Sequence, residues 1–157
     1  MIVLAELAEL IANTLNASNP NNWGTYTVPG YVSAETCLDP ETVMSSTKKK
    51  LFVMPLFTGY SEDGTLKRGR VQSIQATLQL SVTLLIPFQE FSKTDVTDWQ
   101  EVKKILELRE KLDLFVLRTQ WGDYNLASAD PQPPVELELQ QRNFFSSTEF
   151  TFTTQVC

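Results

Sequence analysis

The side chains that could do chemistry here are carboxylates and thiols, because the chain contains no histidine. This excludes Ser-His-Asp and Cys-His arrangements and removes the commonest general base. Glu136 and Glu138 could act as an acid and base pair, but they alternate with apolar residues, and we interpret them as the solvent side of a sheet. Cys37 has no neighbouring base or positive charge that would activate its thiol, and Cys157 is the last residue. The sequence therefore predicts no catalytic residues.

Metal and cofactor sites are not predicted either. The two cysteines lack a CxxC spacing, which argues against zinc. Gly59, Gly64 and Gly69 lie in a predicted hairpin, not between a strand and a helix, so they do not form a phosphate-binding loop. A net charge of −6 argues against a protein that binds tightly by neutralising nucleic-acid phosphates.

We also expect no membrane segment, because the chain has no apolar run near 18 residues. The first residues, MIVLAELAELIANTLN, include Glu6 and Glu9 and have no basic region, unlike a secretory signal peptide. A cytoplasmic product is therefore the expectation.

Two helices are predicted to position the remaining residues. Residues 2–16 carry apolar side chains at spacings of three and four, and the turn formers from Asn16 to Asn22 are expected to end this helix. Thr97 and Gln100 fit a capping box, which predicts a second helix from Thr97 to about Asp113 or a little beyond.

A long β-hairpin over about 51–88 is the strongest prediction. Residues 75–88, QATLQLSVTLLIPF, alternate between apolar and polar. Such a strand would span roughly 40 Å and would extend past its own domain. Its partner is LFVMPLFTGY, residues 51–60, where Pro55 requires an outward-facing position.

The hairpin's turn and the strand ends are predicted from glycine and proline. The pair Asp63-Gly64, together with Gly69, is expected to supply the turn within the polar loop 61–70. Pro87 is expected to end the long strand.

The segments on either side of the hairpin and the second helix are predicted to be short strands and loops. Residues 23–32 predict a short or edge strand, residues 39–50 a loop, and residues 122–134 a surface loop. In the tail, the apolar positions change from odd to even, which requires a bulge or turn near Arg142 and Asn143. The three tryptophans are interpreted as packing residues: Trp23, Trp99 and Trp121. The fold class is then α+β, with a mixed or mainly antiparallel sheet and a long hairpin packed against two main helices.

An interaction surface is the remaining functional candidate. The basic cluster in the hairpin could keep a sheet edge soluble or could dock an acidic partner. Two phenylalanines beside the change of phase could be core residues or an aromatic anchor. The candidate interface residues are Phe57, Tyr60, Lys67, Arg68, Arg70, Phe144 and Phe145.

The order of these elements resembles the tail terminator, or tail completion, family of neck proteins in tailed bacteriophages. The features that carry the likeness are LAELIANTLN, LFVMPLF with QATLQLSVTLLIPF, DWQEVKKILELREKL and RNFFSSTEFTFTT. The likeness covers residues 1–157, taken as a single domain with a protruding hairpin. The segments 39–50 and 122–134 are longer than such a protein is expected to need.

The resemblance implies a structural virion protein and not an enzyme. Six copies would form a ring that caps the tail tube, stops its polymerisation and joins it to the head completion or connector protein. DNA would pass through the lumen without specific binding, and the ring would assemble in the host cytoplasm. No cofactor is implied.

Other functions stay open. One alternative is a head completion or connector protein, or a tail tube protein, which would polymerise into filaments alone. Another is a small-ligand binding module or a carboxylate-based enzyme, for which a pocket with converging Asp or Glu side chains of raised pKa would be the sign.

Overall fold

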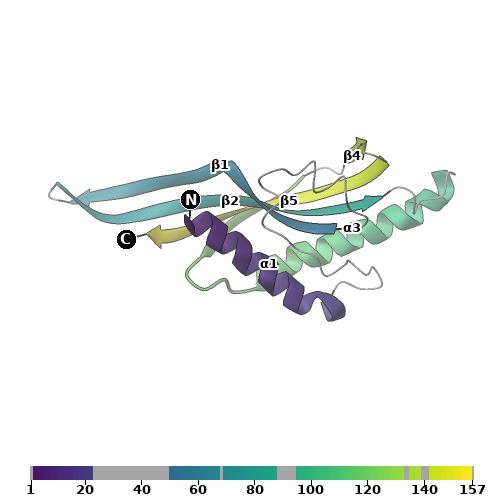
Figure 1. The fold of residues 1–157 in the computed structure, drawn as a ribbon, viewed down its shortest axis with the longest axis horizontal. Helices are drawn as coiled ribbons and strands as arrows, with labels where there is room; N and C mark the ends of the chain where they lie inside the picture. Colours follow the sequence, from purple (N-terminus) through teal and green to yellow (C-terminus); the bar gives the residue numbers. More distant parts are fainter. Residues whose placement is uncertain are drawn as a thin grey trace.

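The computed structural model describes residues 2–22, 50–67, 69–87, 95–132, 135–138 and 142–156. Its five described strands form one antiparallel sheet in the order β1-β2-β5-β3, and β4 also pairs with β5. The fold is α+β, as the sequence predicts (Figure 1). The elements are α1 (Ile2–Asn22), β1 (Lys50–Lys67), β2 (Arg70–Pro87), α3 (Asp95–Arg118), β3 (Asn125–Pro131), β4 (Val135–Glu138) and β5 (Arg142–Val156).

The long strand β2 follows the two-residue period of its sequence. Ala76, Leu78 and Leu80 are fully buried, whereas Gln75 and Gln79, at odd-numbered positions, are exposed. Side chains on a strand point alternately to the two faces of the sheet, so one face of β2 receives the apolar set. The strand has 18 residues and ends at Pro87, which confirms both the predicted length and the predicted end.

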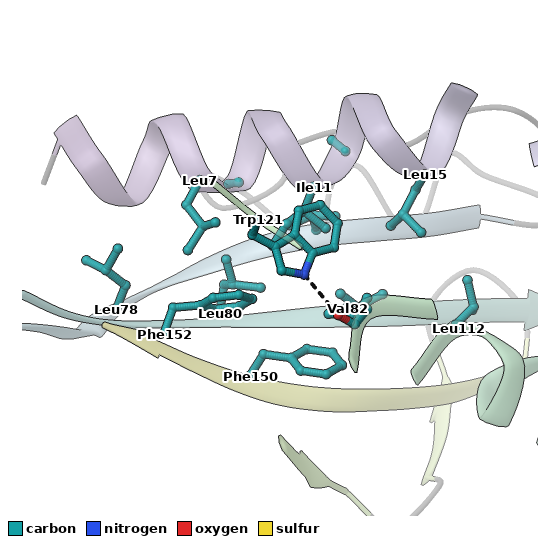
Figure 2. Packing of buried hydrophobic residues seen from close by; sticks show 14 of the residues in the cluster. Leu7, Ile11, Leu15, Leu78, Leu80, Val82, Leu112, Trp121, Phe150 and Phe152 are labelled. Carbon is teal, nitrogen blue, oxygen red and sulfur yellow. Dashed lines mark hydrogen bonds between the residues drawn. The ribbon is translucent and has the colours of Figure 1, made fainter. Parts of the chain in front are cut away.

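Both helices contribute to the apolar core against this face. Leu7, Ile11 and Leu15 of α1 point towards the sheet (Figure 2), and Leu112 of α3 belongs to the same buried cluster. From the sheet, β2 and β5 bring their even-numbered residues, with Leu80 paired to Phe150. Fully burying one such side chain stabilises the fold by about 1.5–3 kcal/mol.

The β1–β2 hairpin extends beyond the rest of the sheet. Strand β5 reaches only as far as Val156, which pairs with Ile74. Arg70, Val71 and Ser73 of β2 therefore pair, among the described strands, only with β1. In Figure 1 the end of this hairpin projects past α1 and past the end of β5.

A wide bulge interrupts β1. Pro55 pairs with Leu80 and Tyr60 pairs with Leu78, so residues 56–59 stand opposite the single residue Gln79. Strand β1 is an edge strand within the described sheet, where the missing N–H of Pro55 is tolerated.

The hairpin turn lies farther along the chain than Asp63-Gly64. Asp63 pairs with Gln75 and Gly64 pairs with Ile74, so this pair belongs to β1. The chain reverses between Lys67 and Arg70, where Gly69 has a φ of 75°. One tight turn at Gly69 suffices, and residues 61–67 instead gain ladder partners on β2. The predicted polar loop 61–70 is therefore wrong except at its end.

The helix ends also differ from the prediction. Helix α1 continues through Pro20 to Asn22, beyond the predicted end. Ala, Ser and Asn each cost at most about 0.7 kcal/mol in a helix, whereas a proline in a helix interior costs about 3 kcal/mol. Helix α3 begins at Asp95, two residues before Thr97, and continues to Arg118. The capping box at Thr97 is therefore inside the helix and does not mark its start.

The C-terminal half contains one unpredicted strand. Strand β3 occupies Asn125–Pro131, within the expected loop 122–134, because it pairs along the free edge of β5. The change of phase in the tail is a change of strand, as predicted, since β4 and β5 are antiparallel with Glu138 opposite Arg142. The predicted strand at 23–32 lies outside the described residues, as does the loop 39–50 except for Lys50.

Candidate functional site

The end of the hairpin collects two of the predicted basic residues. Lys67 and Arg70 stand opposite each other as the last pair of the β1–β2 ladder, on either side of the turn. Gly69 supplies the left-handed backbone that this turn needs. Arg68 lies outside the described residues. We call residues 67–70 the hairpin tip.

Tyr60, another predicted interface residue, makes contacts within its own chain. Its ring packs at the edge of the buried cluster, and its hydroxyl donates a hydrogen bond to the Glu62 carboxylate. That bond, with burial and the negative charge of Glu62, raises the pKa of the Tyr60 hydroxyl. Phe57 lies in the bulge of β1, and its side chain lies outside the described ones.

Phe144 and Phe145 lie at the opposite end of the sheet. Phe145 pairs with Leu85 of β2 and with Val135 of β4. Leu85 is fifteen residues from Arg70, which corresponds to roughly 50 Å along an extended strand. The predicted interface residues therefore do not form one patch: Lys67 and Arg70 lie at the end of the hairpin, and Phe144 and Phe145 lie at the opposite end of the sheet.

A turn after α3 builds a groove that the sequence reading did not find. The indole Nε1 of Trp121 donates a 2.9 Å hydrogen bond to the carbonyl oxygen of Val116, which the dashed line in Figure 2 marks. The amide of Tyr124 donates to the carbonyl of Trp121 at 3.2 Å, and Gly122 has a φ of 66°. From β5, the Thr154 hydroxyl donates to the Asp123 carbonyl at 3.1 Å. Helix and sheet thus fix this turn from both sides.

Residues 119–122 and 124–126 line the groove, which has a volume of about 370 Å³. Trp121 is buried at its base, whereas Gln120, Gly122 and Asn125 are exposed. The lining contains no carboxylate and no basic side chain. Trp121 is the packing residue that the sequence predicts, but its role in a groove depends on contacts between distant segments.

No known protein family's sequence pattern matches this chain, and no curated protein does.

The electrostatics around the groove are acidic. Burial raises the pKa of the Tyr124 hydroxyl, and the negative charges of Glu6 and Asp123 raise it further. Both carboxylates are exposed. Helix α1 thus brings an acidic residue beside the turn, although Glu6 and Asp123 are far apart in the sequence.

Two large apolar side chains are exposed on the helices. Leu10 of α1 is 39% exposed and Leu117 of α3 is 47% exposed. Within the described residues, these are the large hydrophobic side chains that solvent reaches most. Helical spacing alone could not reveal them, because both lie among apolar neighbours that are buried.

Asp113 is the carboxylate with a raised pKa. Burial against the sheet raises the pKa of Asp113, while Thr148 and Arg109 lower it and Glu110 raises it. The Arg109 Nε lies 3.9 Å from the Asp113 Oδ2. The Thr148 hydroxyl is near, although it falls outside hydrogen-bond geometry. Asp113 does not line the groove, so the raised pKa and the cavity lie in different places.

The other candidates for chemistry receive little structural description. Cys37 and Cys157 lie outside the described residues, and the side chains of Glu136 and Glu138 do too. Among the side chains that are described, no three His, Cys, Asp or Glu residues gather as a metal site. Neither described helix contains a stretch long and apolar enough to cross a membrane.

Proposed function

We propose that this chain is a ring-forming tail terminator of a tailed bacteriophage. It caps the tail tube, stops tube polymerisation and joins the tube to the head completion or connector protein. The observation that carries this proposal is the β1–β2 hairpin, whose end pairs with no other described strand and projects past α1 (Figure 1). A projecting hairpin has its surface free for contacts with other subunits.

The charge of the chain is compatible with this role. A net charge of −6 lets DNA pass through a lumen without tight binding. The positive charges of the tip stand out in an acidic chain, and they suit a contact with an acidic protein surface. The α+β fold, with helices on one side of an antiparallel sheet, is the fold that the sequence resemblance implies.

Molar mass in solution tests the proposal. Light scattering after size exclusion, over a wide range of concentration, should find a closed species near six times 17.8 kDa. Growing filaments would instead identify a tube protein, because a heterologous contact that does not close continues without limit. A monomer that also fails to form rings on purified tail tubes would refute the terminator function.

A small-ligand binding module is the alternative in another class. The groove of about 370 Å³ falls within the size range of ligand sites. However, its lining has no carboxylate that could act as an acid or base, and Asp113 lies elsewhere. We therefore favour assembly over catalysis.

A further inference from the structure

The groove after α3 has the character of a cation-binding surface. Its lining residues come from the segment that directly follows α3, residues 119–122 with Tyr124, and from the start of β3. The last carbonyl groups of a helix carry a partial negative charge, which favours a cation within about one turn. Backbone carbonyls, amide side chains and the hydroxyl of Thr119 offer hydrogen-bond acceptors to an ammonium or guanidinium group.

Charged residues around the groove strengthen this character. Glu6 and Asp123 both act on Tyr124, which lines the groove. Glu9 is exposed one turn after Glu6, on the same side of α1. Arg118 is the exposed basic residue in the last turn of α3. We call the groove with Glu6 and Asp123 the acidic groove.

The hairpin tip has the complementary charge. Lys67, Arg68 and Arg70 place three positive charges within four positions of the chain. The ladder holds Lys67 and Arg70 as a pair at the very end of the hairpin. Guanidinium and ammonium groups at such a tip could enter a groove that is lined by neutral polar groups, with the carboxylates of Glu6 and Asp123 beside it.

The tip cannot reach the groove of its own chain. Asp123 accepts a hydrogen bond from Thr154, and Thr154 pairs with Ala76 of β2. Arg70 is six residues farther along the same strand, which is roughly 20 Å away from that level. The hairpin also points away from the helices in Figure 1. A second copy is therefore needed to bring a tip and a groove together.

We infer that the basic hairpin tip of one copy docks into the acidic groove of the next copy, head to tail. This contact is heterologous, since it joins two different surfaces, and repetition of it gives either a closed ring or an open chain. The inference rests on the proposed function only in that the copies assemble, and it adds which two surfaces meet. The groove could also bind a basic segment of a different protein. The experiment below distinguishes that occupant from a second copy of this chain.

Charge reversal on each side, followed by mixing, tests the contact. The tip variant carries Lys67→Glu and Arg70→Glu, and the groove variant carries Glu6→Lys and Asp123→Lys. Each variant alone should self-associate at least about tenfold more weakly, because like charges would then meet. A mixture should recover assembly, because each variant then meets a groove or tip of opposite charge. The control variant Lys111→Glu, at an exposed position on α3, should associate like the original chain.

Crosslinking keeps the test decisive when assembly is weak. Cys37→Ser and Cys157→Ser remove the natural thiols, after which one preparation carries Lys67→Cys and the other Asp123→Cys. A short bifunctional crosslinker should join the two preparations into a mixed dimer. Absence of this dimer at every concentration overturns the inference and leaves the groove for a different partner.

The two proposals fail in different ways. Closed rings that persist in both charge-reversal variants would overturn the tip-to-groove contact but leave the terminator function. Mixed dimers that extend only into open chains would support the contact and refute the closed ring. Circular dichroism of each variant distinguishes a loss of association from a loss of folding. The four changed positions lie in α1, in the β1–β2 hairpin or in the turn after α3, so the spectrum reports whether these elements are still folded.

Discussion

The indole Nε1 of Trp121 donates a 2.9 Å hydrogen bond to the carbonyl oxygen of Val116. Both residues are buried, so this bond joins the end of α3 to the turn that forms the groove. Trp121→Phe keeps an aromatic ring but leaves the buried carbonyl without this donor. We expect a loss of about 1–3 kcal/mol in the free energy of unfolding, measured by urea denaturation.

Leu117→Ala is the matched control for Trp121→Phe. Leu117 lies next to Val116 but is 47% exposed, so the change should alter the free energy of unfolding by less than about 0.5 kcal/mol. Equal losses in the two variants would show that the indole bond contributes nothing specific.

Gly69→Ala should destabilise the hairpin through its backbone alone. A Cβ at this position would meet nothing within 4 Å, so no clash is involved, but the φ of 75° is unfavourable for alanine. The expected cost is about 1–2 kcal/mol in urea unfolding. Gly69→Asn should cost less, because asparagine adopts this conformation more readily. A reversed order of the two variants would contradict this explanation.

Asp113→Asn should stabilise the protein at neutral pH. The pKa of Asp113 is raised above its ordinary value of 3.8, mainly by burial, so folding favours the protonated carboxyl. The contribution of this group to stability is therefore greatest below pH 3.8 and falls as the pH rises through the folded-state pKa. At pH 7 the charged carboxylate costs stability that asparagine would not cost.

Thermal unfolding between pH 3 and pH 8 checks this prediction. The melting temperature of the variant should exceed that of the original chain at pH 7, by a difference that corresponds to about 1 kcal/mol. The difference should shrink as the pH falls towards 3.8. Glu107→Gln, at an exposed position on the same helix, is the control and should show no such gain. A destabilised Asp113→Asn protein at pH 7 would mean that Arg109 outweighs burial.

Phe150→Ala should be among the most harmful changes in the sheet. Phe150 is fully buried on β5 and pairs with Leu80 of β2 and Ala129 of β3. Removing its ring would leave a cavity and should cost about 3–5 kcal/mol in urea unfolding. Gln155→Ala, at an exposed position of the same strand, should cost far less. Similar losses would mean that the ring contributes little.

The sequence predicted the elements whose own pattern determines them. Strand β2 was predictable because its alternation over many residues has only one good arrangement against a core. Strand β3, with the sequence NLASADP, has no β-branched residue and contains three residues that disfavour strands, Asn125, Asp130 and Pro131. It forms because β5 offers a free edge for pairing. The residues of β3 themselves do not indicate that this edge is there.

The candidate site was predictable only in part. The hairpin tip was found because its basic residues are close together in the sequence and near a glycine. The acidic groove was missed because its parts come from α1, the turn after α3 and the start of β3, with Asp123 held by Thr154 of β5 across 31 residues. No spacing within one element could indicate this arrangement.

The bulge at residues 56–59 divides the hairpin into an inner half and an outer half that can unfold separately. On the core side, Leu51 and Val53 of β1 are fully buried, whereas residues 61–64 beyond the bulge are exposed. An interrupted ladder lets the outer half open without unfolding the inner half. Amide hydrogens of the outer half should therefore exchange with solvent much faster than those of the core. Binding to a neighbouring subunit would slow that exchange from the tip inwards and stop at the bulge.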